Sequence, residues 1–467
     1  MTTHSVDVAV IGAGTAGLAA ESHARKAGAS TILIDPAFAG TTCATVGCMP
    51  SKLLIAAADA ADAVRNAKAF GIHATPNIDE AAVMQRVRDM RDGFAQGVRD
   101  SIDNLPDGVA VQARARFDAP GRLALDNGDT VEARVIIVAT GAAPALPGPF
   151  DDLGDRVLTN EDIFELTTLP RRLGVIGGGP LGLEMAQAMH RLGVDVTLFD
   201  ASDRLAALAA ETSAALHKIL SQHFKIHLST KPQPEMNEDG VTLGWDGESI
   251  AVDKILVAAG RPPSVAGLEP ENAGLPMQDG APVVDERSLQ WGDAPVFVAG
   301  DANAARAVLH EASTEGAIAG ANAVAWPEIG QANRTVPLAI CFCRPTAATI
   351  GTGPDDSTVT GSTDFSDQGR ASVMARAEGL LQIHARKSDG RLVGASLCVP
   401  GGEHLAHLLA WCIDMGLSAS DVLNRPFYHP TLEEGLQSAL REICKAVGEA
   451  TPWQRNDDDV PGGRACG

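Results

Sequence analysis

The chain lacks the features that would place it at a membrane or on nucleic acid. No run of about 18 uncharged apolar residues occurs in its 467 residues, so we expect no transmembrane helix. A strand-like run already begins near Val6, which leaves no room for a signal peptide. Basic residues are outnumbered, with 37 Lys and Arg against 59 Asp and Glu, and a net charge of −22 disfavours phosphate backbones and anionic lipid. We therefore expect a cytoplasmic protein whose main role involves neither a membrane nor nucleic acid.

Cysteine is sparse, and most of it shows no motif spacing. Six of the 8 cysteines are scattered, which is typical of reduced thiols in a reducing compartment. Among them, Cys341 and Cys343 are interpreted as strand core, and Cys466 as an incidental thiol in the C-terminal tail. Cys43 and Cys48 stand five residues apart, but zinc would need two further ligands, and no second CxxC or nearby histidine pair is present. We therefore predict no metal site.

Two segments of the chain follow a strand, glycine-rich turn and helix pattern. In the first, Gly12, Gly14 and Gly17 follow a strand and open a helix, and Asp35 ends the next strand. The first glycine permits a tight turn, the second lets a pyrophosphate approach the backbone, and the third lets helix and strand pack closely. The helix N-terminus favours phosphate, and the acid is placed to bond a ribose hydroxyl. This context predicts a dinucleotide site.

The second segment repeats the pattern farther along the chain. Gly177, Gly179 and Gly182 form its turn, and Asp200 ends its second strand. A carboxylate at this position favours NAD and repels the 2′-phosphate of NADP, although the nearby Arg204 could weaken that preference. Two dinucleotide folds in one chain indicate hydride relay between two dinucleotides, for which FAD and NAD are the usual pair.

The pair Cys43 and Cys48 precedes an Ala-rich segment, residues 51–104, that has helical spacing. The two thiols could close a small disulfide ring near the start of a helix, where the helix N-terminus favours the reactive thiolate. Because a cytosolic disulfide is usually catalytic or redox-sensing, the pair predicts a redox centre rather than a structural bridge.

Further motifs complete a resemblance to a known family. Besides the turns above, the chain contains TTCATVGCMPSK, VATGA, AAGRPP, VAGDANA, LHEASTEG and FYHPTLEE. With these motifs it resembles the pyridine nucleotide–disulfide oxidoreductases with a CxxxxC centre over nearly its whole length, and it is most similar to their dihydrolipoyl dehydrogenase branch. Departures from the family pattern are Thr41, which replaces a usual glycine, and Arg344 and Thr346, which replace usual residues around Pro345.

The resemblance implies an α/β fold with two Rossmann-like domains and a C-terminal α+β dimerisation domain. We expect an FAD-binding domain at 1–149 that a central domain at 271–333 completes, and an NAD-binding domain at 150–270. The dimerisation domain is expected at 334–450. The polar, Gly- and Pro-rich tail at 451–467 is predicted to be disordered.

The resemblance also implies roles for individual residues. Cys43 would exchange with the substrate disulfide, Cys48 would face the flavin, and Lys52 and Glu184 would form a pair near the flavin N5. Further residues are expected to line the two dinucleotides, namely Thr140, Gly141 and Asp301 for FAD and Gly260 for NAD.

His429 and Glu434 match the family motif in which a histidine, held by a glutamate, takes and returns the thiol proton. Such a base is needed because a thiol with an ordinary pKa attacks poorly at neutral pH. Thr431 and Glu434 also match a capping box, so Glu434 has two possible roles, and one residue may serve both. In the family, the histidine reaches the other subunit's site, which implies a homodimer with shared active sites.

The predicted reaction is oxidation of dihydrolipoamide, on a lipoyl-bearing carrier domain or as a small dithiol, with NAD+ as acceptor. Asp200, the FYHPTLEEGL context and the lack of an obvious arginine pair for an NADP phosphate favour this choice. Two alternatives remain: an NAD(P)H-dependent reductase of another disulfide or of mercuric ion, and a non-catalytic flavoprotein redox sensor.

Overall fold

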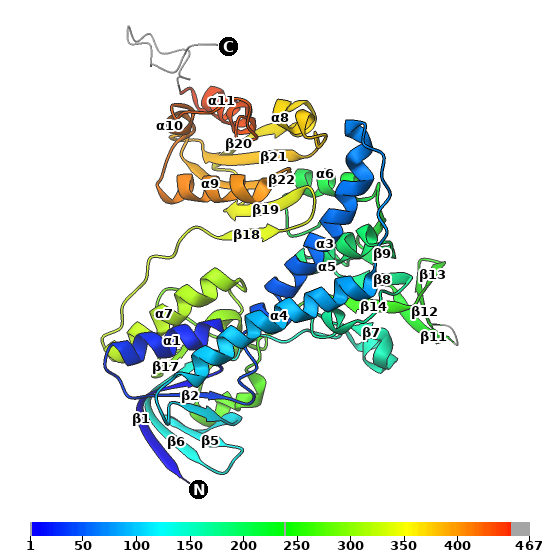
Figure 1. The fold of residues 1–467 in the computed structure, drawn as a ribbon. Helices are drawn as coiled ribbons and strands as arrows, with labels where there is room; N and C mark the ends of the chain where they lie inside the picture. Colours follow the sequence, from blue (N-terminus) through cyan, green and yellow to red (C-terminus); the bar gives the residue numbers. More distant parts are fainter. Residues whose placement is uncertain (1, 238–239, 450–467) are drawn as a thin grey trace.

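The computed structural model describes residues 2–237 and 240–449 (Figure 1). The predicted disordered tail at 451–467, with Cys466, lies outside the described residues. Three sheets carry the three units of the chain, and long helices cross between them.

The first sheet has a parallel centre that two distant parts of the chain build. Its strands follow the order β3-β2-β1-β6-β5-β4, and β17 pairs in parallel with β6. Strand β17 lies far beyond β6 in the sequence, so this unit is completed by a later segment. The strands are β1 (Thr3–Ile11), β2 (Thr31–Asp35), β3 (Ala110–Gln112), β4 (Ala115–Ala119), β5 (Arg122–Leu125), β6 (Thr130–Val138) and β17 (Val296–Val298).

Two helices from the same distant segments pack closely on this sheet. Helix α1 (Thr15–Lys26) follows β1, and α7 (Leu309–Ala325) follows β17; Figure 1 shows them side by side. A Cβ at Gly316 of α7 would lie 2.3 Å from the Ala16 carbonyl oxygen of α1. Only glycine fits such a backbone contact. This contact therefore fixes the middle of α7 beside the first turn of α1, which follows the glycine-rich turn.

The second sheet repeats the parallel arrangement and carries the second glycine-rich turn. Its strand order is β10-β9-β8-β14-β7, and α5 (Pro180–Arg191) follows β8 as α1 follows β1. The small antiparallel sheet β11-β12-β13 lies beside it. The strands are β7 (Val157–Leu158), β8 (Arg172–Ile176), β9 (Asp195–Phe199), β10 (Lys225–His227), β11 (Gln233–Asn237), β12 (Gly240–Trp245), β13 (Glu248–Val252) and β14 (Lys254–Val257), with α6 (Ala210–Leu220).

The apolar runs at 134–141, 254–261 and 295–301 form strands only in their first halves, as β6, β14 and β17. Their last residues, which include the ATG, AAGR and AGD sequences, leave the sheets as loops. Because parallel strands end at one edge of a sheet, these loops gather at the edge where ligands bind in such folds.

The Ala-rich segment forms two helices that connect the first two units. They are α3 (Cys48–Asn66) and α4 (Glu80–Asp103), and α3 packs against both α4 and α5. Leu53 and Leu54 of α3 share a core with Leu183 and Met185 of α5. A helix that begins at a cysteine is thereby anchored in the second nucleotide-binding unit.

The C-terminal unit is an antiparallel sheet with helices, as predicted. Its order is β18-β19-β22-β21-β20, and Figure 1 shows it at the top of the molecule. Helix α6, which packs on β21 and β22, and strand β18, which packs on α5, place it against the second unit. Its elements are β18 (Leu338–Cys341), β19 (Thr346–Gly351), β20 (Thr358–Asp364), α8 (Gly369–Val373), β21 (Leu380–Arg386), β22 (Leu392–Val399), α9 (Gly402–Asp414), α10 (Ala419–Leu423) and α11 (Gly435–Val447).

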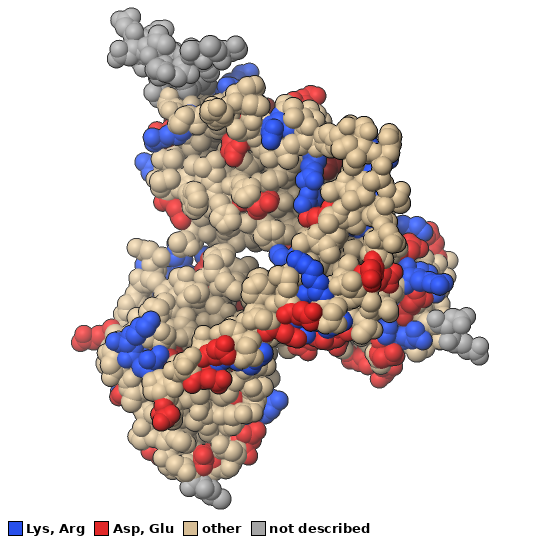
Figure 2. All heavy atoms as spheres, in the orientation of Figure 1, with Lys and Arg blue, Asp and Glu red and all other residues tan. Residues whose placement is uncertain are grey.

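Acidic and basic side chains are interspersed on the face of the molecule in Figure 2, and the surface is hollowed between α7 and the C-terminal unit. Among the residues that the structure describes, none of the helices combines the length and apolar composition needed to cross a bilayer.

Replacement of glycine by alanine should change the stability of the protein in opposite directions at the α1–α7 contact and at an open position on α4. Gly316→Ala forces a Cβ against the Ala16 carbonyl and should destabilise the protein by about 1–3 kcal/mol. Gly93→Ala on α4 adds a Cβ with no atom within 4 Å and should stabilise it by roughly 0.5–1 kcal/mol. Urea unfolding of both variants measures this difference; equal effects of one sign would contradict the packing described.

Candidate functional site

Cys43 and Cys48 lie on two consecutive helices that only a short loop separates. Cys43 is in α2 (Thr42–Thr45), and Cys48 is the first residue of α3. Thr41, where the family has glycine, caps α2: its hydroxyl accepts a hydrogen bond from the Ala44 N–H at 3.3 Å. The departure from the family pattern therefore supplies an N-cap to the redox loop, residues 40–52, which carries both cysteines. Both cysteines are free thiols in this structure.

The two thiols have very different acidities. The Cys43 thiol donates a hydrogen bond to the Cys48 sulfur, and this bond, helped by the Lys52 charge and opposed by burial, lowers the pKa of Cys48 to about 6. The same hydrogen bond, with burial, raises the pKa of Cys43 well above its ordinary value. The helix N-terminus at Cys48 also favours a negative charge. The reduced pair is thus one thiolate and one thiol that share a proton.

Lys52 and Glu184 form an ion pair beside these sulfurs, in which the glutamate is buried and the lysine half-buried. Lys52 Nζ lies 2.7 Å from Glu184 Oε2, and the Glu184 side chain is only 4% exposed. The other oxygen, Oε1, accepts the Phe342 backbone N–H at 2.9 Å, and Lys52 Nζ lies 4.5 Å from the centre of the Phe342 ring. The predicted pair is therefore brought together, and it is fixed by a residue of the C-terminal unit.

Gln187, one helical turn after Glu184, extends this connection. Its amide accepts the Arg344 N–H at 2.8 Å and donates to the Arg344 carbonyl at 2.7 Å. Sequence reasoning missed both Phe342 and Gln187. The only signal was the presence of two polar residues, three apart, in the otherwise apolar helix GLEMAQAM.

The first glycine-rich turn has the shape of a dinucleotide cradle. A Cβ at Gly12 would lie 2.4 Å from the Ala139 carbonyl oxygen, and one at Gly17 would lie 1.8 Å from the Gly12 carbonyl oxygen, whereas Gly14 faces open space. Asp35 Oδ2 accepts the Ala13 N–H at 2.9 Å. Close packing at the outer glycines and space at the middle one fit a pyrophosphate at the helix start.

The neighbouring loops add polar groups to this cradle. The Thr140 hydroxyl is buried and has no hydrogen-bond partner in the structure, which fits a residue that bonds a ligand. Gly141 has a φ of +69° and open space around it. Asp301 lies in the turn η6 (Gly300–Asn303), and a Cβ at Gly300 would lie 3.0 Å from the Ala16 Cβ of α1. These predicted FAD residues therefore surround the first turn of α1.

A cavity of about 800 Å³ lies at the second glycine-rich turn. Gly177, Gly179, Asp200 and Gly260 line it, as predicted for the second dinucleotide. Gly182 lies below it, where a Cβ would meet the Gly177 carbonyl oxygen at 1.9 Å. The cavity has the size and the lining expected of a dinucleotide site.

Asp200 and Lys231 are among the charged residues that line this cavity, whereas the sequence indicated Asp200 and Arg204. Asp200 Oδ1 accepts the Ser202 N–H at 2.6 Å, and Oδ2 accepts the Gly178 N–H. Arg204 is not among the lining residues, and its Nε lies 3.8 Å from Asp203. Lys231 does line the cavity, and sequence reasoning missed it.

Asn160 connects this cavity to the redox loop. It lines the cavity, and its amide donates to the Val46 carbonyl, between the two cysteines, at 3.0 Å. Its oxygen accepts from Arg261 at 3.2 Å, and Arg261 also donates to the Ala142 carbonyl. No motif indicated Asn160, because its partners are distant in the sequence.

The predicted acid–base residues form a pair on the C-terminal unit. His429 Nδ1 lies 3.0 Å from Glu434 Oε1, and Glu434 Oε2 accepts the Thr431 N–H at 2.9 Å. Burial favours the neutral carboxyl, but the hydrogen bonds from Thr431 and His429 together lower the pKa of Glu434. The capping-box prediction is only half right: Glu434 bonds the Thr431 N–H, but α11 begins at Gly435, and the Thr431 hydroxyl donates to the Tyr428 carbonyl instead.

His429 makes no described hydrogen bond or ion pair to either cysteine of its own chain, and its side chain is 82% exposed. The pair His429 and Glu434 therefore stands at the surface, already joined by a hydrogen bond. Such an arrangement suits a group that acts on another molecule or another subunit.

The cysteines outside the loop have core positions. Cys341 and Cys343 are buried at the end of β18 and share a core with Cys398. The adjacent Cys343 thiol and burial raise the pKa of Cys341, which makes it a poor nucleophile. Within residues 2–237 and 240–449, no cluster of three or more His, Cys, Asp or Glu residues could hold a metal ion.

Comparisons with known proteins agree with this geometry. The family model described as pyridine nucleotide-disulphide oxidoreductase matches residues 6–317, and the model of its dimerisation domain matches residues 338–440. The dihydrolipoyl dehydrogenase of Haloferax volcanii is 32% identical, with 95% of this chain and 97% of the relative covered. That of Thermus scotoductus is also 32% identical, covering 94% of this chain and 97% of the relative.

Solved structures share the fold at lower identity. The HOCl-induced flavoprotein disulfide reductase RclA from Escherichia coli superposes with a TM-score of 0.80 at 24% identity, covering 93% of this chain and 99% of that one. LpdA from Mycobacterium tuberculosis superposes with a TM-score of 0.79 at 23% identity, covering 95% of this chain and 100% of that one.

The site predicts that Lys52 helps to keep Cys48 ionised. Lys52→Met removes the nearby positive charge, so the midpoint of Cys48 ionisation should rise by about one pH unit or more. The pH dependence of Cys48 alkylation by iodoacetamide in the reduced protein, followed by peptide mass spectrometry, measures that midpoint. Lys68→Met, beyond the far end of the same helix, is the matched control and should leave it unchanged. An unaltered midpoint in Lys52→Met would refute the electrostatic role.

Proposed function

Because the chain belongs to the pyridine nucleotide-disulphide oxidoreductase family, we propose that it oxidises dihydrolipoamide to lipoamide, with FAD and NAD+ as its cofactors. The observation that carries the proposal is the Cys43–Cys48 pair. The Cys48 sulfur of this pair is stabilised as a thiolate, and the Lys52–Glu184 ion pair lies beside it. Two dinucleotide cradles meet the requirements of a flavin and a nicotinamide, and the curated relatives at 32% identity carry the dihydrolipoyl dehydrogenase name.

The thiol chemistry assigns a different task to each cysteine. In the oxidised enzyme, a substrate thiolate attacks the Cys43 sulfur of a Cys43–Cys48 disulfide, and the Cys48 thiolate leaves. The second substrate thiol then attacks the mixed disulfide, which releases lipoamide and leaves Cys43 reduced. Cys48 is the better leaving group because Lys52 and the helix N-terminus stabilise its thiolate as it leaves. Once Cys43 is reduced, the hydrogen bond from its thiol, with the Lys52 charge, lowers the pKa of Cys48 to about 6.

Each attack requires that a thiol proton be removed and held. We assign this task to His429, which Glu434 orients and stabilises in its charged form. Since His429 and Glu434 lie on the unit that matches the family's dimerisation domain, His429 would serve the cysteines of the partner subunit in a homodimer.

Residues of the two cradles would hold the cofactors. Gly12, Gly14 and Gly17, with Asp35, Thr140, Gly141 and Asp301, would bind FAD; Gly177, Gly179, Gly182, Asp200 and Gly260 would bind NAD. Bound FAD would accept two electrons from the dithiol and pass them to NAD+. Lys52 and Glu184 would keep the adjoining sulfur ionised and in place.

The same pair of cysteines is compatible with substrates other than dihydrolipoamide. A reductase that works in the other direction, on another disulfide or on mercuric ion, would use the same sulfur pair, and RclA shows that the fold also occurs in a disulfide reductase of another name. A redox sensor without turnover would need only the flavin and the thiols. The carrier-bound form of the substrate and a cytoplasmic location stay predictions.

Turnover assays on the purified flavoprotein test these possibilities directly. We expect oxidation of dihydrolipoamide with NAD+ to exceed the reduction of glutathione disulfide or Hg²⁺ by NADPH by at least about tenfold. Cys48→Ser should lose nearly all of this activity, together with the long-wavelength absorbance of a thiolate against a flavin. A higher rate with another pair would reassign the substrate, and no turnover with any pair would favour the sensor.

The proton-accepting role predicts a large effect at one exposed histidine. His429→Gln should lower kcat for dihydrolipoamide oxidation by about 10²- to 10⁴-fold, because it removes the imidazole that would take the thiol proton. His404→Gln, at another exposed histidine of the same unit, serves as the control and should retain wild-type kcat. Steady-state kinetics would count against the role if the two variants behaved alike.

A further inference from the structure

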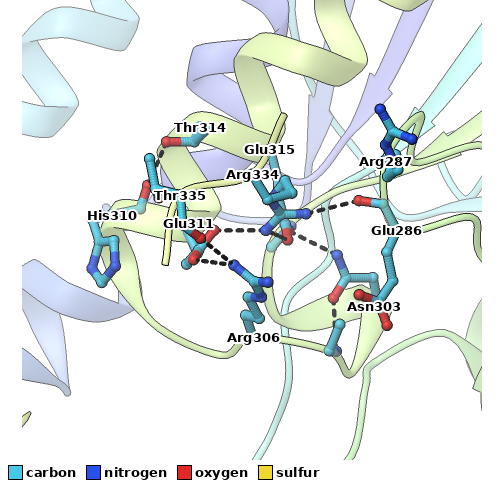
Figure 3. Close-up of polar contacts among 12 residues, drawn as sticks. Glu286, Arg287, Asn303, Arg306, His310, Glu311, Thr314, Glu315, Arg334 and Thr335 are labelled. Carbon is cyan, nitrogen blue, oxygen red and sulfur yellow. Dashed lines mark hydrogen bonds and ion pairs between the residues drawn. The ribbon is translucent and has the colours of Figure 1, made fainter. Parts of the chain in front are cut away.

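Glu315 is a fully buried carboxylate that the reaction described above does not use. It lies on α7, is 0% exposed, and accepts three hydrogen bonds (Figure 3). Its Oε2 accepts the Gly300 backbone N–H at 2.7 Å and the Asn303 amide at 2.7 Å. Its Oε1 accepts from Arg334 at 2.6 Å.

Two of these bonds hold the two ends of a single turn. Gly300 and Asn303 are the first and last residues of η6, and Asp301 lies between them. One carboxylate oxygen therefore fixes the turn at both ends, from the side of α7. Asp301 is half-buried and belongs to a turn that lies against the first turn of α1, where a Cβ at Gly300 would lie 3.0 Å from the Ala16 Cβ.

The third bond brings in a distant cation. Arg334 lies on the segment that joins α7 to β18, and its side chain is 9% exposed. It also pairs with Glu311 at 2.6 Å and donates to the Glu286 carbonyl at 3.0 Å. A second arginine, Arg306, pairs with Glu311 at 2.9 Å. Figure 3 shows the two glutamates and two arginines as one network.

Burial makes this cation necessary. Moving a carboxylate out of water costs free energy unless the carboxylate is paired with a cation and hydrogen-bonded. Burial raises the pKa of Glu315, although the bonds from Arg334 and Gly300 act to lower it. Without Arg334, Glu315 would take up a proton or draw in water, and its oxygen would bond the turn less strongly. The turn therefore depends on an arginine from the segment that leads to the C-terminal unit.

We propose that Glu315 is a positioning residue for FAD, which holds the Gly300–Asn303 turn so that Asp301 can bind the flavin dinucleotide, and that Arg334 makes this hold depend on the seating of the segment before the C-terminal unit. The inference rests on the proposed flavin site. It extends that site to residues that do not touch the cofactor.

Glu311 provides a matched comparison within the same network. It shares Arg334 with Glu315 and is also buried, at 2% exposed, but none of its described bonds reaches the turn. A role in general stability would make the two glutamates equivalent. A role in flavin positioning would distinguish them.

The test measures the release of FAD from the purified holoenzyme after dilution, by the rise in free flavin fluorescence. Glu315→Gln keeps the shape but weakens the charge-assisted bonds to the turn, and should release FAD about tenfold faster than wild type. Glu311→Gln should release it within about threefold of wild type, although urea unfolding of the two apoproteins should show similar losses of stability. Similar release rates for Glu315→Gln and Glu311→Gln, or for Glu315→Gln and wild type, would overturn the proposal.

A second variant covers the case in which Glu315→Gln does not fold. Asn303→Ala removes the bond that the amide donates to Glu315 and the bond that its oxygen accepts from the Ala305 N–H, and it leaves all four charged residues of the network in place. It should release FAD about threefold faster or more, and a wild-type rate would overturn the proposal. Wild-type protein that is purified without flavin and does not take up added FAD would instead refute the proposed function.

Discussion

The redox chemistry of this molecule depends on one buried carboxylate, Glu184, placed behind the sulfurs. Because its charge is out of water, it must be matched by a cation and hydrogen-bond donors. Lys52 supplies the cation from α3, and the Phe342 N–H supplies a donor from the C-terminal unit. The pairing holds the lysine beside Cys48. The hydrogen bond from Cys43 and this positive charge together keep the pKa of Cys48 low.

A buried carboxylate balanced by a cation occurs a second time, beside the turn Gly300–Asn303. Glu315 is buried on α7, and Arg334, from the segment before β18, balances it. In both places a carboxylate on a helix of a nucleotide-binding unit is satisfied by the chain as it enters the C-terminal unit. The C-terminal unit and the segment before it are thus joined to both nucleotide-binding units by directional, charge-assisted contacts, in addition to the apolar core around β18.

Much of the fold could be predicted because its signals are local. Both glycine-rich turns, their strands and helices, and the change to antiparallel strands near residue 334 follow from short patterns of apolar residues and glycines. The apolar runs at 254–261 and 295–301 are longer than the strands β14 and β17, since apolar character continues into the loops that follow. Helix α11 begins at Gly435 and not at the possible capping box of Thr431, because the Thr431 hydroxyl bonds the Tyr428 carbonyl instead.

The sequence by itself determined which groups we propose for the chemistry: the two cysteines, their lysine, the two acids after the glycine-rich turns, and the histidine with its glutamate. Those residue types have few substitutes, and their spacing reflects bonding within one loop or one helix turn. Only the tertiary structure decided which groups hold them in place, such as Phe342 through its backbone, Asn160 beneath the redox loop, and Arg334. A backbone N–H has no identity in a sequence, and a polar side chain gains its partner only when distant segments pack together.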